Sequence, residues 1–491
     1  MDTNTETEQL NAFSTTKVIG LLLGLGLFLL TFIVPAPENM SDTAWSTAGI
    51  TLLLAVWWAT EAIPIPMTSL LPLLLFPAMG VMSLADSAAP YAKPTIFLLM
   101  GGFIIATGLA RWNLHRRLSL NILARVGNHP SSLIAGFMGT TALISMWISN
   151  TASTIMMIPI ALSVASEVIH DTKKQHQGFV LCLILGIAYS ASIGGLGTII
   201  GTPPNLFVVS FMKENYDTDI SFLSWMMFGI PTVIVMVFCA WWVLTKWAFP
   251  YNIEDVPVAT DAIKTELKKM GKMTTPEKRI ALVFALVALS WILRVPIQKN
   301  LDLFPWLKDA MIAVGGAVLM FMIPSGSKTE KNTALLDWET AQKIPWGVLL
   351  LFGGGLSLAA AVKSTGLALW IGNNLSILTS LDMILMLLCL VTLVVFLTEL
   401  TSNTATTATL LPVLGALALA GGMEPMLLFA PTALAASCAF MLPVATAPNA
   451  VIYSTGKVTI PQMAHAGFKL NLVAIIMVTL LAYAMIPAIF G

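Results

Sequence analysis

Charge is scarce in this chain. Only 10% of its 491 residues are Asp, Glu, Lys or Arg, whereas 57% are hydrophobic. Soluble domains carry about 25% charged residues, so the composition indicates a polytopic membrane protein. The 25 basic residues are matched by 25 acidic ones, which leaves no excess positive charge for binding nucleic acid.

Reactive motifs are also missing. The four cysteines (Cys182, Cys239, Cys389 and Cys438) lie in apolar runs without a CxxC pair, which favours buried hydrophobes over a metal site or a disulfide framework. No GKS or GKT phosphate loop occurs, so nothing supports ATP-driven transport by this chain alone. GxSxG and HExxH are absent too, and we predict that the protein is not an enzyme.

Apolar runs fill most of the chain, from about 18–34 to 469–490. A full crossing of the bilayer needs about 20 residues. Several runs are shorter or carry Gly and Pro, which predicts half-helices or re-entrant hairpins there. The first run lacks a basic flank and a small-residue cleavage site, so it is typical of a first membrane helix rather than a signal peptide.

Basic residues predict the orientation of these runs. Clusters occur after the run at 95–110, in the polar loop at 246–280 and around Lys328, Lys331 and Lys343. Such clusters favour the cytoplasm, which predicts a cytoplasmic N-terminus and a C-terminus outside. The two halves of the chain then run in opposite directions, as in an inverted repeat.

Matching segments support this repeat. "SNTASTIMMIPIALSVA" (149–165) parallels "SNTATTATLLPVLGALA" (402–418), and "GTPPNLFVVS" (201–210) parallels "ATAPNAVIYS" (445–454). The glycine-rich "FLLMGGFIIATGLA" (97–110) parallels "LLLFGGGLSLAAAV" (349–362). Three matches in the same order indicate a duplicated unit.

The two SNT motifs are predicted to lie at the tips of hairpins spanning 132–166 and 383–420. Non-helical backbone at membrane depth needs protein or a water-filled cavity to satisfy it. The oxygens of Ser, Asn and Thr and freed carbonyls suit a hard cation such as Na⁺. The second arms, expected from Ala152 and Ala405, present helix N-termini that suit an anion. The alternative is that Ser and Thr only cap these arms.

Two further segments, 194–205 and 442–449, interrupt apolar helices with Gly, Pro and Asn. Interrupted helices at matching places in two halves indicate a transporter site, although ordinary proline kinks are the alternative. Glu61 is predicted at a helix end. Glu399, one turn before the second SNT, is left open as a proton-coupling carboxylate, a third cation ligand or a packing group.

Together these motifs resemble the divalent-anion:sodium symporter family, which includes bacterial and animal dicarboxylate and citrate carriers. The resemblance covers nearly the whole chain and includes "WWATEAIPIP" (57–66), both SNT motifs, "GTPPN" and "SCAFMLPVATAPN" (437–449).

The resemblance implies an all-α inverted-repeat transporter with two re-entrant helical hairpins and two broken helices. It implies a homodimer in which a transport domain slides against a scaffold as an elevator. The scaffold would comprise 18–127 and 246–375, and the transport domain 128–245 and 376–491.

The resemblance also implies site residues. The first Na⁺ site would use Ser145, Ser149 and Asn150 with Gly194, Gly195 or Gly201. The second would use Thr398, Thr401, Asn403 and Ala445. Substrate carboxylates would meet Asn150, Thr151, Asn403 and Thr404. Relatives often read "ATPPN" where this chain reads "ATAPN", so Ala447 implies a slightly roomier substrate pocket.

We therefore predict Na⁺-coupled import of C4-dicarboxylates (succinate, malate and fumarate) across a cell membrane, by the resemblance a bacterial inner membrane. Citrate or sulfate symport and Na⁺-independent dicarboxylate exchange are alternatives within the same fold. An anion channel is the alternative from a different class.

Overall fold

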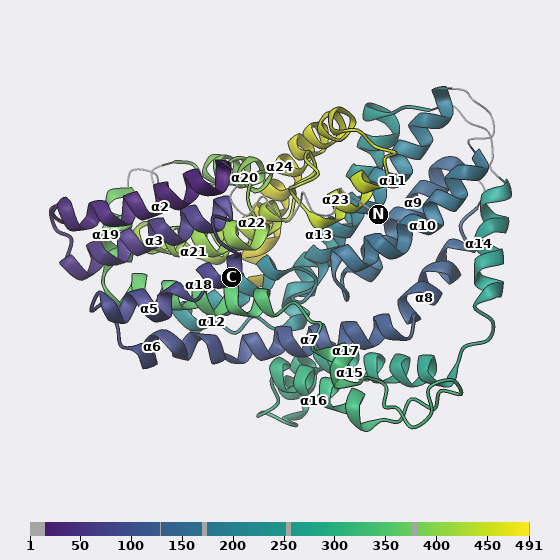
Figure 1. The fold of residues 1–491 in the computed structure, drawn as a ribbon, viewed down its shortest axis with the longest axis horizontal. Helices are drawn as coiled ribbons and strands as arrows, with labels where there is room; N and C mark the ends of the chain where they lie inside the picture. Colours follow the sequence, from purple (N-terminus) through teal and green to yellow (C-terminus); the bar gives the residue numbers. More distant parts are fainter. Residues whose placement is uncertain (1–14, 128, 169–173, 252–256, 376–380, 491) are drawn as a thin grey trace, which may run out of the picture. The chain divides into compact units, whose positions relative to one another are not determined.

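The chain is helical, as predicted. The computed structural model describes residues 15–127, 129–168, 174–251, 257–375 and 381–490. Within these ranges the only β-structure is one isolated bridge between Pro324 and Ala334. Eight helices of the described part are long and apolar enough to cross a membrane, which confirms a multi-pass all-α protein (Figure 1).

Packing divides the chain into two compact units. The first unit comprises Met1–Lys93, Trp346–Asp382 and Thr401–Pro425, and the second comprises Pro94–Pro345, Met383–Leu400 and Met426–Gly491. Each unit combines segments from both halves of the sequence. The predicted division into scaffold and transport domains concerns movement and stays a prediction.

The first unit is built from two early helices, several short ones and three later helices. These are α2 (Thr15–Ile33), α3 (Asp42–Thr60), α4 (Ile65–Thr68), α5 (Leu71–Ala78), α6 (Leu84–Ala88), the 3₁₀ helix η1 (Ala89–Ala92), α18 (Trp346–Ser364), α19 (Leu367–Leu375) and α21 (Asn403–Gly421). Small residues let helices approach closely in membranes. Gly353 of the "GGG" motif faces the ring of Tyr91, and Ser357 donates to the Ser87 carbonyl at 2.9 Å.

The second unit contains the remaining helices. From the first half come α7 (Pro94–Arg111), α8 (Leu114–Leu123), α9 (Pro130–Ser145), α10 (Asn150–Val168), α11 (Lys174–Gly194), η2 (Gly195–Gly197), α12 (Pro203–Tyr216), α13 (Phe222–Trp242) and the π-helical η3 (Val243–Ala248). From the rest come α14 (Pro257–Lys269), α15 (Thr275–Leu301), α16 (Asp309–Met322), α17 (Trp338–Ala341), α20 (Met383–Thr398), α22 (Met426–Ala436), α23 (Ala447–Ser454) and α24 (Ile460–Phe490).

Helix α11 forms the centre of the second unit. Every residue from Phe179 to Ile199 is buried, as expected for a helix that is apolar all round. It packs against α9, α10, α13 and α23. This buried helix is the first half of the first broken helix, and α10, which carries the first SNT motif, and α23 of the second broken helix both pack against it.

The chain leaves the helical conformation at both predicted interruptions. α11 ends at Gly194 and α12 begins at Pro203, while α22 ends at Ala436 and α23 begins at Ala447. Proline suits the first turn of a helix, where its missing N–H has no intrahelical partner. The Pro-Pro and Ala-Pro pairs thus restart a helix after each break.

The helices α9 and α20, which precede the SNT motifs, each have 16 residues. At 1.5 Å per residue they are about 24 Å long, short of a bilayer core of about 30 Å. These lengths suit arms of re-entrant hairpins. Since α20 belongs to the second unit and α21 to the first, the second hairpin stays a prediction.

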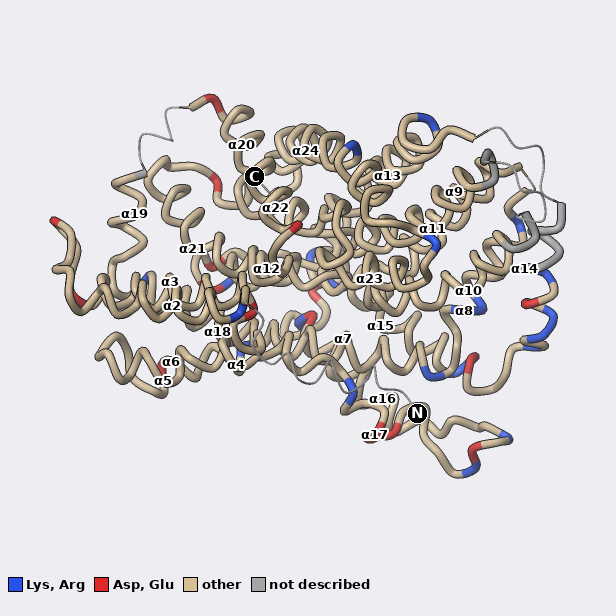
Figure 2. Tube along the Cα trace, turned by 45° about the horizontal axis from the view of Figure 1, so that its top comes forward, with Lys and Arg blue, Asp and Glu red and all other residues tan. Residues whose placement is uncertain are grey.

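Ion pairs join loops that were predicted to lie on the same side of the membrane. Arg111 pairs with Glu330 at 2.8 Å, and Arg116 and Arg117 pair with Glu266 and Glu277 of the 246–280 region. Figure 2 shows basic residues gathered along α8 and α14 of this unit, whereas α9, α13 and α22 carry no charge. Three loops predicted to be cytoplasmic therefore meet. Which side of the membrane they lie on, and on which side each terminus lies, stay predictions.

Candidate functional site

Three oxygen atoms converge at the end of α9. The Ser145 hydroxyl lies 2.7 Å from Asn150 Oδ1 and 2.7 Å from the Ala191 carbonyl oxygen. A hydroxyl has one proton and can donate to only one of these oxygens. Ser145 is fully buried, so the cluster is a group of neutral oxygen ligands of the kind that hard cations bind.

The first broken helix approaches the same asparagine. A Cβ at Gly195 would lie 2.8 Å from Asn150 Oδ1 and 3.1 Å from the Gly201 carbonyl oxygen. A Cβ at Gly201 would collide with the Gly195 carbonyl, and one at Gly194 would collide with the backbone of Ala142 in α9. Of the three predicted glycines, Gly195 therefore lies beside Asn150, Gly201 packs against Gly195, and Gly194 serves the packing of α11 on α9.

The first SNT motif begins α10 two residues earlier than predicted. The helix starts at Asn150, not Ala152, because the Ser149 hydroxyl accepts the Ala152 N–H at 3.2 Å and caps it. Ser149 is exposed and Asn150 and Thr151 are half-buried. The capping role that the sequence left as an alternative is thus present at Ser149, while Asn150 contacts the oxygen cluster.

The segment between α9 and α10 is fixed to the broken helix and to aromatic neighbours. The Thr198 hydroxyl donates to the Met146 carbonyl at 2.5 Å. Trp147 stacks on Phe222 with ring centroids 6.0 Å apart, and Phe222 stacks on Trp291 at 4.6 Å. These contacts order the segment that carries Asn150.

The second half repeats part of this geometry in the second unit. Thr398, like Ser145, lies five residues before the motif asparagine, and its buried hydroxyl donates to the Ala436 carbonyl at 2.7 Å. Ala436 ends the helix that leads into the second break. Ala445 lies near the end of that break and is buried.

The other residues predicted for the second site lie in the first unit. Thr401 Oγ1 is 2.6 Å from Thr406 Oγ1, and Asn403 starts α21, with Thr404 buried behind it. The Thr407 hydroxyl donates to the Asn403 carbonyl at 2.9 Å. Thr154 donates to the Asn150 carbonyl in the same way at 2.9 Å, so the same hydrogen bond occurs in the first turn of both SNT helices. The second cation site stays a prediction.

Glu399 anchors the second broken helix. Its carboxylate accepts from the backbone N–H groups of Phe440, Met441 and Leu442 at 2.7 to 3.2 Å, and from Asn471 Nδ2 at 2.7 Å. A carboxylate surrounded by N–H donors has its lone pairs occupied. Of the roles left open by the sequence, this geometry favours the packing role over a cation ligand.

One structural feature and one sequence feature help to define what the site can bind. Among the described residues, no three His, Cys, Asp or Glu side chains lie close enough to hold a metal ion. The segment 145–160 contains no charged residue. This segment therefore offers a cation neutral oxygen atoms, and it offers an anion the N-terminus of α10.

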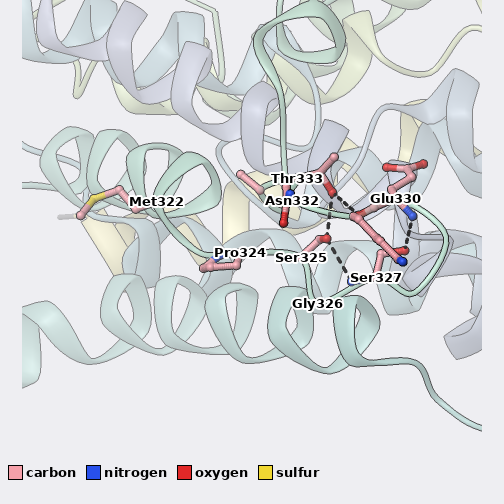
Figure 3. Close-up of a pocket in the computed structure, with 10 residues that line it drawn as sticks. Met322, Pro324, Ser325, Gly326, Ser327, Glu330, Asn332 and Thr333 are labelled. Carbon is pink, nitrogen blue, oxygen red and sulfur yellow. Dashed lines mark hydrogen bonds between the residues drawn. The ribbon is translucent and has the colours of Figure 1, made fainter.

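A cavity of about 550 Å³ elsewhere in the second unit does not belong to this site. It lies along the loop after α16, and its polar groups bind one another, as Figure 3 shows. Ser325 Oγ is 2.9 Å from Thr333 Oγ1, and Ser327 Oγ accepts the Glu330 N–H at 3.1 Å. These hydrogen bonds join residues of the same loop, so they stabilise the conformation of that loop.

Several groups at or near the site were not predictable from the sequence. The Ala191 carbonyl gives no signal in the sequence, because a backbone oxygen belongs to every residue type. Thr198 and Asn471 are polar residues within apolar helices or motifs, yet only their partners Met146 and Glu399 reveal their roles.

Comparisons with known proteins agree with this architecture. A family model described as the sodium:sulfate symporter transmembrane region matches residues 15–490. The chain is 42% identical over 485 residues to the sodium-dependent dicarboxylate transporters SdcS of Staphylococcus saprophyticus and Staphylococcus aureus, covering 98% of this chain and 93% of each relative.

Two solved transporter structures share the fold at low sequence identity. The YdaH transporter of Alcanivorax borkumensis is 14% identical with a TM-score of 0.60, covering 96% of this chain and 98% of that one. MtrF of Neisseria gonorrhoeae, described among antimetabolite efflux pumps, is 14% identical with a TM-score of 0.59, covering 97% of this chain and 96% of that one.

Proposed function

Because the chain belongs to the divalent-anion:sodium symporter family, we propose that it is a secondary active transporter that couples Na⁺ to the import of C4-dicarboxylates. Succinate, malate and fumarate are the proposed substrates. The 42% identity to transporters named as sodium-dependent dicarboxylate transporters supports this choice over other anions.

The oxygen cluster around Asn150 carries the proposal. Ser145 Oγ lies 2.7 Å from Asn150 Oδ1 and 2.7 Å from the Ala191 carbonyl oxygen. Gly195 lies beside Asn150, and the Gly201 carbonyl oxygen lies beside Gly195. We assign the first Na⁺ to this place and a second Na⁺ to Thr398, Thr401, Asn403 and Ala445.

The substrate carboxylates are proposed to meet the N-termini of α10 and α21. Thr151 and Thr404 follow the motif asparagines there, and the first turn of each helix carries the partial positive charge of the helix dipole. Ala447, which starts α23, is exposed, and its small side chain leaves room beside the substrate.

Coupling follows from electrostatics. A dianion has no Lys or Arg to neutralise it along 145–160, and unlike charges attract strongly where water is scarce. Bound Na⁺ therefore raises affinity for the dicarboxylate, and the dicarboxylate raises affinity for Na⁺ by the same factor. If more than two Na⁺ accompany each dianion, the membrane potential adds about 2.3 kcal/mol per net charge per 100 mV.

The proposed mechanism is an elevator within a homodimer. Segments 18–127 and 246–375 would form the scaffold, and 128–245 and 376–491 would carry the substrate across. The protein would lie in a bacterial inner membrane with its N-terminus in the cytoplasm and its C-terminus outside. The same-side ion pairs of Arg111, Arg116 and Arg117 support this arrangement of loops.

The proposal is tested by succinate uptake into proteoliposomes of the purified protein, with Na⁺ or K⁺ as the only external cation. We expect succinate to accumulate above its external concentration with Na⁺ and not with K⁺. An inward Na⁺ gradient should be sufficient to drive the accumulation.

Other outcomes identify the alternatives. Equal uptake in both cations that requires internal dicarboxylate would indicate an exchanger. Uptake that equilibrates without accumulating would indicate an anion channel. Failure to transport succinate, with Na⁺-driven uptake of citrate or of sulfate, would keep the symport and change the substrate; the family's description names sulfate.

A further inference from the structure

Asn205, in the first broken helix, donates to the loop that precedes it. Its side chain is fully buried. Asn205 Nδ2 lies 2.9 Å from the Gly195 carbonyl oxygen, 2.8 Å from that of Thr198 and 3.4 Å from that of Leu196. One amide group therefore gathers the carbonyls of the turn that passes beside Asn150.

Asn449 repeats this arrangement in the second broken helix. It is also fully buried, and its Nδ2 lies 3.1 Å from the Ala439 carbonyl oxygen and 3.0 Å from that of Leu442. The acceptors are ten and seven residues before the asparagine in both halves. The inverted repeat thus preserves a specific contact as well as a motif.

Both asparagines act as donors only. Within the described part of the chain, Asn205 Oδ1 and Asn449 Oδ1 are buried and have no hydrogen-bond partner. A buried acceptor without a donor costs about 1–3 kcal/mol. Rotating the side-chain amide by half a turn would place Oδ1 against the backbone carbonyl oxygens, which would repel it. The carbonyls therefore determine the orientation of the amide. Both positions require the NH₂ group as a donor.

Helix formation does not explain these residues. Each asparagine is the third residue of its helix, after Pro203 and Pro204 or Ala447 and Pro448. Asn has a low helix propensity, and its capping role belongs at the position before the helix, which Thr202 and Thr446 occupy here.

We propose that Asn205 and Asn449 are a symmetric pair of positioning residues that hold the two broken-helix loops in their cation-binding shape. The inference rests on the proposed Na⁺ coupling and extends it to residues outside the SNT motifs. Asn205 holds the carbonyl of Gly195, whose Cα faces Asn150 Oδ1. Asn449 holds Leu442, whose N–H is held by Glu399 from the other side.

The test replaces each asparagine by aspartate, which has the same shape but presents oxygen where Nδ2 donates. The Na⁺ concentration for half-maximal succinate uptake is measured in proteoliposomes, together with the rise in melting temperature that Na⁺ alone produces in the purified protein. For Asn205→Asp and Asn449→Asp we expect the half-maximal Na⁺ concentration to rise about tenfold or more. The KM for succinate should return to the wild-type value at saturating Na⁺.

Asn121→Asp is the matched control. Asn121 Nδ2 also donates to a backbone carbonyl, that of Arg117 at 2.8 Å, but within α8. Its Na⁺ dependence should equal that of the wild type. If the aspartate variants do not fold, Asn205→Ser and Asn449→Ser, which keep one donor, should show a smaller rise of the same kind.

Each other outcome has a defined meaning. Folded aspartate variants with wild-type Na⁺ dependence would overturn the positioning role and leave the proposed function standing. If neither the succinate uptake nor the melting temperature of the wild-type protein depended on Na⁺, the proposed function would be overturned, and the positioning role with it. Loss of folded protein in all four variants would assign both asparagines to folding and overturn the proposal.

Discussion

Asn150→Ala is expected to abolish Na⁺-dependent succinate uptake at ordinary Na⁺ concentrations. The substitution removes the side-chain oxygen that lies 2.7 Å from Ser145 Oγ and beside Gly195. If that oxygen contributes about 3 kcal/mol to Na⁺ binding, as contacts to charged groups do, the half-maximal Na⁺ concentration rises by roughly 100-fold.

The measurement for Asn150→Ala is the Na⁺ dependence of initial uptake rates, with size-exclusion chromatography to verify folding. Asn121→Ala serves as the control, because its side chain bonds only to its own helix α8 in the contacts described. Wild-type Na⁺ dependence in a folded Asn150→Ala protein would remove Asn150 from the cation site.

Gly195→Ala is expected to cause a similarly large loss of uptake from a single methyl group. The new Cβ would lie 2.8 Å from Asn150 Oδ1 and 3.1 Å from the Gly201 carbonyl oxygen. Both atoms belong to the proposed site, and overpacking of a buried position costs about 1–3 kcal/mol. The methyl group therefore displaces the same oxygens that Na⁺ requires.

Gly139→Ala provides the control for Gly195→Ala. Gly139 lies in α9, the helix that ends at Ser145, and a Cβ there would have no neighbour within 4 Å. Alanine should be neutral or stabilising at Gly139, since it favours helix by about 1 kcal/mol over glycine. Equal activity of the two variants would show that the approach of Gly195 to Asn150 is unimportant for transport.

The helical architecture and both helix breaks were predictable from the sequence. Apolar runs indicate helices because a bilayer demands internal hydrogen bonding. Gly194, Gly195 and Gly201 with the following prolines interrupt such a run, and the helix ends at Gly194 as the glycines suggest. Proline and glycine act on the local backbone, so their effect is visible without tertiary information.

The contacts of individual side chains were less predictable. The role of Glu399 was open in the sequence, because its partners Phe440 to Leu442 and Asn471 are distant along the chain. A non-helical SNT tip predicts that α10 starts at Ala152. The capping bond of Ser149 moves that start to Asn150.

The repeat itself contained more information than its motifs suggested. "GTPPN" and "ATAPN" were interpreted as helix breakers, and their asparagines received no role. The matching contacts of Asn205 and Asn449 show why a donor follows the prolines in both halves. A repeated polar residue beside a repeated helix break is the signal that could have found them.

The most direct test of Na⁺–dicarboxylate coupling is to measure ²²Na⁺ and radiolabelled succinate entering the same proteoliposomes. We predict that succinate stimulates Na⁺ entry, that the two accumulate in a constant ratio of at least two Na⁺ per succinate, and that Asn150→Ala abolishes both. Succinate entry without any succinate-dependent Na⁺ entry would contradict the coupling and the assignment of Na⁺ to the oxygen cluster at Asn150.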